Sequence, residues 1–190
     1  MVSDVVGYVA LGANIGDREA NLEAGLAGMT DLGLPPTRRS SIWETEPVGT
    51  AEPQWFLNMA VQVRTSRAPI EVLETLLEIE RRVGRTRSGM RNAPRVLDLD
   101  LLALGNARVE SSRLTLPHPR MWERRFVLAP LAEIAPGLRD PATGRTVRQT
   151  LERLPDDPAV RPLRNDCATA VAGPAIIRVA RPSGPEHPGT

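Results

Sequence analysis

The alternation of hydrophobic and polar positions predicts core elements in the order strand, helix, strand, strand, helix, strand. The strand candidates are apolar stretches bounded by turn residues, at 5–13, 37–46, 56–63 and 98–104. Between them, apolar residues recur every three or four positions over 17–32 and 66–84, as in amphipathic helices. This order is the split, ferredoxin-like β-α-β-β-α-β arrangement. We therefore expect an α+β fold with a mostly antiparallel sheet and helices packed on its faces.

The rest of the sequence predicts shorter elements, followed by a change in amino-acid composition. Short strands are expected at Val109 and 113–116, and helices over 121–134 and 146–154. Beyond Leu154 prolines become frequent, and the one sustained apolar run covers 175–180. We expect one domain over residues 1–160 and a proline-rich, partly disordered C-terminal extension over residues 161–190.

Two aspartates interrupt the most apolar strand candidate. Because alternate residues of a strand face the same side, Asp98 and Asp100 should project together, while Leu97 and Leu99 face the opposite layer. Adjacent buried carboxylates are costly unless a cation lies between them. A run of arginines precedes them: Arg81, Arg82, Arg85, Arg87, Arg91 and Arg95. For each arginine alone, a solvated surface is the simpler interpretation. Together with paired carboxylates, they suit a ligand that carries polyphosphate and Mg²⁺.

The amino-acid composition excludes several classes of chemistry. All 24 basic residues are arginine, which excludes a lysine nucleophile, a Schiff base and a P-loop lysine. The single cysteine, Cys167, excludes an internal disulfide and a cysteine metal cluster. The glycine-bearing turn at 12–16 lacks a phosphate-loop motif, so we interpret it as structural. A formal net charge of +1 does not point to nucleic acid, and no apolar run is long enough to span a membrane, so we expect a cytoplasmic protein that binds neither. We also expect a monomer.

The run from Arg91 to Leu102 resembles the signature of the 6-hydroxymethyl-7,8-dihydropterin pyrophosphokinase family. The similarity continues in collinear order over about residues 5–137, in ALGANIGD, TEPVG, FLNMAV, EIERRVGRTR and LTLPHPRMWERRFVLAPLAEIAP. In this folate-pathway family, ATP donates its β,γ-pyrophosphoryl group to the pterin hydroxymethyl oxygen, leaving AMP. The resemblance implies this activity here, with ATP and the pterin as substrates and two Mg²⁺ ions as cofactor.

The resemblance also implies roles for individual residues. Asp98 and Asp100 would bind the metal, and Arg85 and Arg95 would lie near the transferring phosphates. The remaining ATP site would be formed by Glu80, Arg87, Leu101, Arg113, Thr115, His118 and Arg124. The pterin site would draw on Thr45, Val48, Phe56, Asn58 and Phe126, with the phenylalanines sandwiching the ring and the asparagine reading its edge. No expected contact lies beyond Phe126.

Some positions depart from the family pattern, and two other functions compete. Asn92 replaces a common tryptophan, and Ser88 stands where a basic residue can occur, which bears on how the arginine loop closes. One rival is a nucleotide- or RNA-binding module of ferredoxin-like type. It lacks support because no RNP1 pattern is present and the acidic pair would repel a phosphate backbone. The other rival is an ordinary single-phosphate kinase, which would yield ADP rather than AMP.

Overall fold

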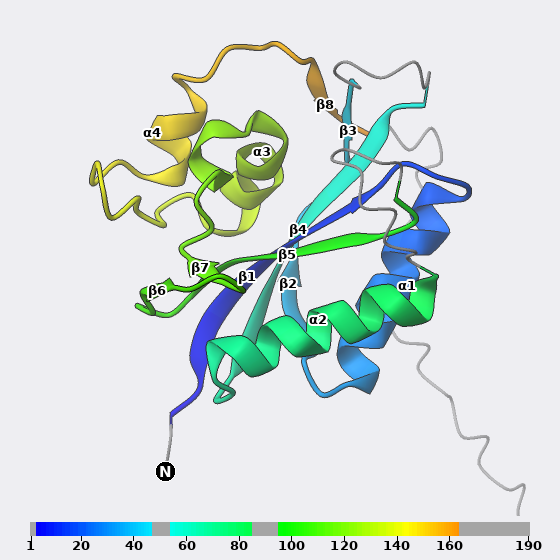
Figure 1. Ribbon diagram of the computed structural model, residues 1–190. Helices are drawn as coiled ribbons and strands as arrows, with labels where there is room; N and C mark the ends of the chain where they lie inside the picture. Colours follow the sequence, from blue (N-terminus) through cyan, green and yellow to red (C-terminus); the bar gives the residue numbers. More distant parts are fainter. Residues whose placement is uncertain (1–2, 47–53, 85–94, 164–190) are drawn as a thin grey trace, which may run out of the picture.

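The computed structural model describes residues 3–46, 54–84 and 95–163 (Figure 1). Val48, Arg85 and Arg87, the arginine loop and the apolar run at 175–180 lie outside the described residues. The centre of the fold is a 6-stranded sheet of order β5-β1-β4-β3-β8, in which β2 also pairs with β4. Its pairings are antiparallel. Its strands are β1 (Val5–Ala13), β2 (Pro36–Arg39), β3 (Trp43–Thr45), β4 (Phe56–Thr65), β5 (Asp98–Leu104) and β8 (Val160–Pro162).

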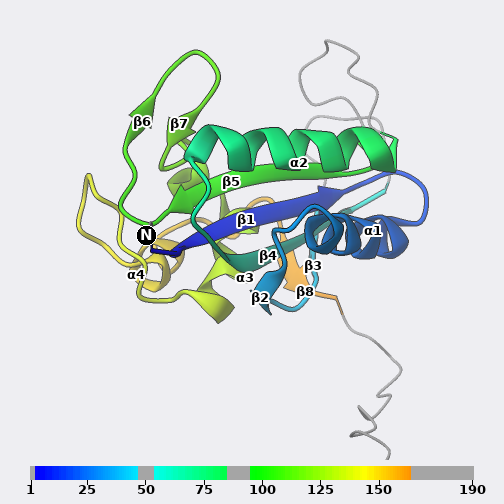
Figure 2. The same ribbon diagram turned by 90° about the horizontal axis from the view of Figure 1, so that it is seen from below.

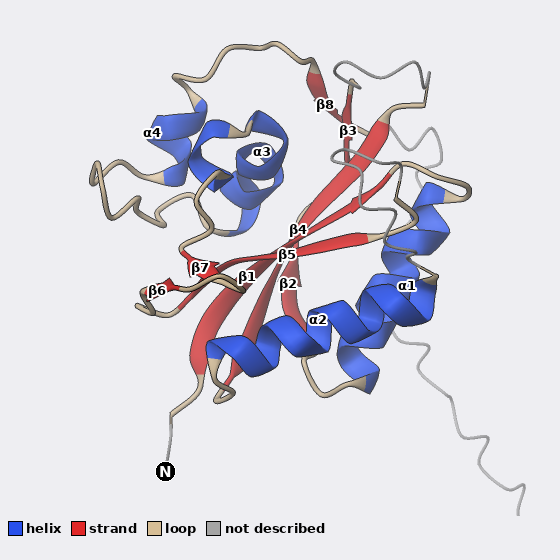
Figure 3. Ribbon diagram, in the orientation of Figure 1, coloured by secondary structure: helices blue, strands red, loops and turns tan. Residues whose placement is uncertain are grey.

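Helices cover both faces of this sheet (Figures 2 and 3). One face packs against α1 (Arg18–Asp31) and α2 (Pro69–Val83). The other packs against α3 (Arg125–Ile134), with α4 (Val147–Leu151) beside it. The short elements between β5 and α3 are β6 (Val109–Glu110), β7 (Thr115–Leu116) and the 3-10 helix η1 (Met121–Glu123). The expected ferredoxin-like α+β fold is confirmed.

The strand pattern divides the core into two layers. Leu11 of β1, Met59 of β4 and Leu99 of β5 are buried against α1 and α2. The smaller layer beneath α3 includes Ala60 and Leu102. Alternation along β5 therefore turns Asp98 and Asp100 away from the large layer, onto the α3 side of the sheet. Both side chains line a cavity there.

The second predicted strand, 37–46, is divided into β2 and β3. Ser40 lies between them and exchanges hydrogen bonds with Ala60: its backbone N–H donates to the Ala60 carbonyl (2.9 Å), and its hydroxyl accepts from the Ala60 N–H (3.0 Å). The side chain thus supplies a bond that a continuous ladder would make through the backbone. The division leaves β3 as a short segment of its own.

Other boundaries also shift. Helix α2 begins at Pro69 rather than residue 66, since the Glu71 carboxylate accepts the Ala68 backbone N–H (2.7 Å) and closes the first turn there. It ends at Val83, and its C-cap is Gly84, whose φ of 107° favours glycine. Strand β8 was not predicted, and it carries the sheet to Pro162, past the expected domain boundary at residue 160. Within the described ranges, no helix is long and apolar enough to cross a membrane.

Candidate active site

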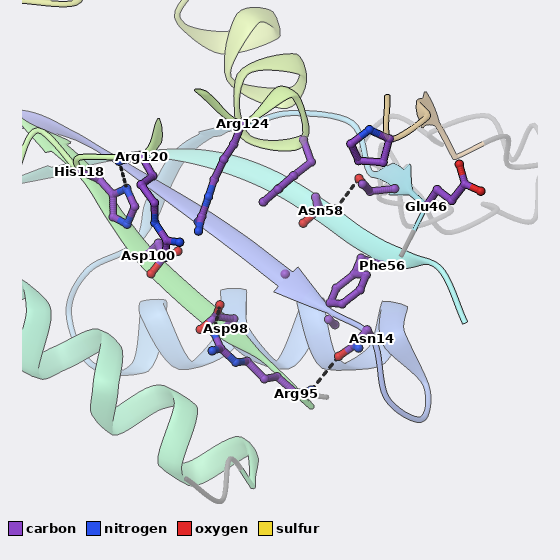
Figure 4. Close-up of a pocket in the computed structure, with 15 residues that line it drawn as sticks. Asn14, Glu46, Phe56, Asn58, Arg95, Asp98, Asp100, His118, Arg120 and Arg124 are labelled. Atoms are coloured by element: carbon purple, nitrogen blue, oxygen red, sulfur yellow. Dashed lines mark hydrogen bonds and ion pairs between the residues drawn. The ribbon is translucent and has the colours of Figure 1, made fainter. Parts of the chain in front are cut away.

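A cavity of about 340 Å³ opens on the α3 side of the sheet, where the C-terminal end of β1 meets the N-terminal ends of β4 and β5 (Figure 4). This volume is in the range of small-molecule sites. The described residues that line it are Gly12, Ala13, Asn14, Thr45, Glu46, Phe56, Asn58, Arg95, Asp98, Asp100, His118, Arg120, Arg124, Phe126 and Pro158. The cavity has a strongly charged end and an aromatic, amide-bearing end.

At the charged end, Asp98 and Asp100 lie side by side on β5, as the strand period predicted (Figure 4). Burial raises the pKa of Asp100, and the neighbouring Asp98 carboxylate raises it further. His118, Arg124 and Arg95 oppose this shift. Two like charges are thus held together in a partly dehydrated site. Such a pair is relieved when a cation binds between the carboxylates.

Arg95 is fixed at the start of this strand by Asn14. The Asn14 side-chain oxygen accepts the Arg95 backbone N–H (2.7 Å), and the Asn14 backbone N–H donates to the Arg95 carbonyl (3.1 Å). The Arg95 guanidinium forms an ion pair with Asp98. The turn at 12–16, interpreted from the sequence as structural, therefore positions a residue expected to contact phosphate.

Further cations approach Asp100 from the segment before α3. Burial lowers the pKa of Arg124, and the neighbouring Arg120 lowers it further, while Asp100 and Asp98 oppose this effect. Figure 4 shows Arg120 and Arg124 reaching toward the carboxylates from this segment. Clustered, partly buried guanidinium groups repel one another. A polyanion bound among them would remove that repulsion.

His118 joins the same group. Its pKa is lowered by burial, an effect that Asp100 opposes and that Arg124 and Arg120 reinforce. Its Nδ1 accepts the Arg120 backbone N–H (3.3 Å), so in the neutral ring the proton resides on Nε2. His118 can then donate one hydrogen bond from Nε2 without carrying a charge.

The opposite end of the cavity suits a flat ring with polar edges. Phe56 and Phe126 both line it, as expected. The buried Asn58 amide donates to the Thr45 hydroxyl (2.8 Å), which fixes the orientation of the amide group. A Cβ atom at Gly12 would lie 3.3 Å from the Asn58 side-chain oxygen, so glycine leaves room beside that acceptor.

The donor set at the charged end could hold Mg²⁺. This ion usually binds one or two protein carboxylates, and substrate phosphates and water complete its octahedron. Among the residues that the structure describes, no cluster of three or more histidine, cysteine, aspartate or glutamate side chains could hold a metal by itself. The Asp98–Asp100 pair supplies the number of protein carboxylates that Mg²⁺ uses when substrate phosphates and water complete its coordination.

The structure brings most of the expected site residues together. The cavity is lined by the expected residues Thr45, Phe56, Asn58, Arg95, Asp98, Asp100, His118, Arg124 and Phe126. Four other expected ATP residues do not line it. Leu101 is buried in the core layer beneath α1 and α2, because it alternates with Asp100 along β5. Thr115 lies on β7, and the exposed Arg113 donates to Glu74 (3.1 Å).

Glu80 is the fourth expected ATP residue that does not line the cavity, and it contacts β5 from α2, on the opposite face of the sheet. Its carboxylate is buried and accepts the backbone N–H of Leu99 (2.8 Å), the residue between the two aspartates. This bond joins α2 to β5. It therefore supports the strand that carries both carboxylates.

Several lining residues were missed from the sequence: Gly12, Ala13, Asn14, Glu46, Arg120 and Pro158. A local signal existed for Arg120, which directly follows the rigid Pro-His-Pro segment. Asn14 and Glu46 belong to segments whose similarity to the family was recognised without a role for these residues. Pro158 gave no local signal, because only the long-range pairing of β8 with β3 brings it to the cavity.

We predict that Asn14→Ala lowers kcat about tenfold. The Arg95 backbone N–H would lose its hydrogen-bond acceptor, and the Arg95 side chain would then be held less firmly in position. Asn21→Ala is the matched control, because the Asn21 side-chain amide donates to the Ile15 carbonyl of the same turn (2.8 Å) rather than to Arg95. Steady-state kinetics of both variants would separate the roles. Equal losses would mean that only the turn matters, not its bond to Arg95.

Residues 8–136 match the family described as 7,8-dihydro-6-hydroxymethylpterin-pyrophosphokinase (HPPK). A Bacillus subtilis protein named 2-amino-4-hydroxy-6-hydroxymethyldihydropteridine pyrophosphokinase is 46% identical over 145 residues, which cover 76% of this chain and 86% of that protein. A protein of the same name from Methylorubrum extorquens is 44% identical over 148 residues, which cover 77% of this chain and 92% of the relative.

Among solved structures, the wild-type HPPK-DHPS protein of Plasmodium falciparum shares the fold, with a TM-score of 0.60 at 14% identity. The match covers 78% of this chain and 41% of that longer chain. At this identity the likeness concerns the fold alone. With the family match spanning both ends of the cavity and relatives aligned over most of their length, this chain belongs to the 7,8-dihydro-6-hydroxymethylpterin-pyrophosphokinase family.

Proposed function

We infer that this protein transfers the β,γ-pyrophosphoryl group of ATP to the hydroxymethyl oxygen of 6-hydroxymethyl-7,8-dihydropterin, leaving AMP, in folate biosynthesis. One observation carries this inference: a single cavity joins a carboxylate–guanidinium end to an end with two phenylalanines and a fixed amide. The first end suits a metal-bound polyphosphate and the second a flat heterocycle. The reaction needs these two ligands next to each other.

At the charged end, Asp98 and Asp100 would hold Mg²⁺, with two ions expected from the family. Bound Mg²⁺ supplies charge neutralisation on the phosphates and alignment of donor with acceptor. Arg95 and Arg124 donate to phosphate oxygens as negative charge develops on them. Neutral His118 adds a donor at Nε2. Transfer is thus driven by positioning and electrostatics.

At the other end, Phe56 and Phe126 stack on the two faces of the pterin ring. Asn58 uses one amide N–H on Thr45, which leaves its side-chain oxygen to accept from the N–H groups at the ring edge. The ring is thereby fixed with its hydroxymethyl group toward the phosphates.

The test is product identity. We expect incubation with ATP, Mg²⁺ and the pterin to release AMP and pterin diphosphate in equal amounts, resolved by ion-exchange chromatography. Without the pterin, AMP should stay at background, which controls for ATP hydrolysis. Release of ADP would instead identify a single-phosphate kinase. If neither nucleotide forms above background, the proposed function is wrong.

A further inference from the structure

Residues 155–162 form a strap that follows α4 along the chain, ends in β8 and runs along one side of the cavity. Figure 1 shows this part of the chain leaving α4, beside α3, and arching across the top of the view to β8, beside β3. Pro158, in the middle of the strap, lines the cavity together with Thr45, Phe56 and Phe126. The strap lies outside the residues that match the family, 8–136.

One end of the strap is attached at the start of α3. The Arg125 guanidinium donates to the carbonyls of Leu151 (3.2 Å) and Leu154 (3.0 Å), at the C-terminal end of α4. It also forms an ion pair with Asp156 of the strap. Arg125 directly precedes Phe126, so these contacts connect the strap to one of the two ring-binding phenylalanines.

The other end is attached to β3. Strand β8 pairs with β3 in the register Glu44 to Arg161 and Thr45 to Val160. Just before this ladder, the Glu46 backbone N–H donates to the Ala159 carbonyl (3.0 Å). The backbone directly after Pro158 is therefore fixed to β3, which carries Thr45, and to Glu46 just beyond it.

Arg161 strengthens this second attachment. Its guanidinium donates to the Glu44 carboxylate at 3.2 and 3.4 Å, and it lies 4.3 Å from the centroid of the Trp55 ring. Trp55 directly precedes Phe56, and its carbonyl accepts from Arg18, which also lies 3.8 Å from Glu44. An isolated surface ion pair contributes little. Here two guanidinium nitrogens donate to one carboxylate oxygen, and the ring contact and the strand ladder act with this pair to hold one geometry. These contacts connect the strap to the second phenylalanine.

We propose that the strap is a wall of the pterin subsite and sets the separation of Phe56 and Phe126. Pro158 borders the acceptor heterocycle, and Arg161 is a positioning residue that acts through Trp55 and Glu44. This proposal rests on the proposed function, since it assigns the aromatic end of the cavity to the pterin. It adds a selectivity determinant from a part of the chain that the family match does not include.

The test is the separate KM of each substrate in the full-length chain. We expect Arg161→Ala and Pro158→Gly each to raise the KM for the pterin about five- to tenfold, because a looser ring slot binds less well. The KM for ATP should stay within about twofold, because the contacts described above join the strap to residues beside Phe56 and Phe126. Asp156→Ala, at the other attachment, should show the same selectivity, and Arg161→Lys should retain part of the wild-type affinity. Arg153→Ala, an exposed arginine just before the strap, should change neither constant.

Each outcome distinguishes the two proposals. If the wild type releases no AMP, the proposed function fails. If the wild type is active but these variants raise both KM values equally, or neither, the strap proposal is overturned while the function stands. A purely structural role would lower the melting temperature or kcat without a selective change in the pterin KM. Should Arg161→Ala fail to fold, Pro158→Gly and Asp156→Ala decide the matter by the same criterion.

Discussion

Asp100→Asn should lower turnover about 10³-fold at saturating Mg²⁺, while the protein stays folded. The reason is that a metal bound by carboxylates supplies several kcal/mol of charge stabilisation in phosphoryl transfer, and each 1.4 kcal/mol is a factor of about ten. Asparagine keeps the size of the side chain and removes its charge. Asp98→Asn should lose activity similarly, since both carboxylates line the same end of the cavity.

The same substitution should not weaken the metal-free fold at neutral pH. The pKa of Asp100 is raised by burial and by Asp98, so the folded protein holds this proton more tightly than the unfolded chain does. The protonated Asp100 side chain therefore contributes to stability fully below the ordinary aspartate pKa, and this contribution is lost as pH rises through the raised pKa of the folded state. At neutral pH the charged carboxylate therefore opposes folding, and Asp100→Asn should have an equal or higher melting temperature in EDTA.

Kinetics with a Mg²⁺ titration and calorimetry in EDTA would measure the two effects. Glu110→Gln, which neutralises an exposed carboxylate on β6, is the control and should alter neither. Near-normal turnover of both aspartate variants at saturating Mg²⁺ would refute the metal assignment. A large fall in the melting temperature would show instead that the carboxylates stabilise the fold.

Arg95→Ala should lower kcat about 10²- to 10³-fold, the loss seen when one preorganised donor to developing negative charge is removed. Arg95 lines the cavity, and Asn14 holds both its backbone N–H and its carbonyl. The Arg95 side chain therefore needs little rearrangement during transfer. The KM for the pterin should change far less than kcat. Single-turnover measurements with ATP in excess would isolate this step.

Arg81→Ala is the matched control. Arg81 lies at the end of α2, where its guanidinium forms an ion pair with Glu78 (2.8 Å) and its side chain is 71% exposed. Such pairs contribute little, and we expect kcat to be unchanged. Similar losses in both variants would mean that the arginine-rich stretch acts as a diffuse basic surface.

The charged end of the cavity was the part most readily predicted, for a geometric reason. Side chains two residues apart in a strand share a face whatever the rest of the fold does, so the spacing of Asp98 and Asp100 was sufficient. The same period that paired the aspartates also buried Leu101, expected from the resemblance to lie near the nucleotide. A local rule thus predicts the pairing of the carboxylates, while the place of Leu101 near the nucleotide stays a prediction from the resemblance.

The missed features depend on contacts between distant parts of the chain. The division of the strand at Ser40 requires Ala60, and the role of Asn14 requires Arg95. Strand β8 has no alternating pattern and contains a proline, so only the exposed edge of β3 explains its pairing. Periodicity carries no information on such partners.

The late position of β8 in the chain has a consequence for biosynthesis. Because a chain emerges from the ribosome N-terminus first, β1, β4 and β5 can pair before residues 160–162 exist. Until then the outer edge of β3 presents unpaired backbone groups, the kind of edge that invites intermolecular pairing. Strand β8, with Pro162 as its last residue, closes that edge and ends the ladder with a residue that cannot donate. The half of the cavity assigned to the acceptor is therefore completed last, and the same step removes an aggregation-prone edge.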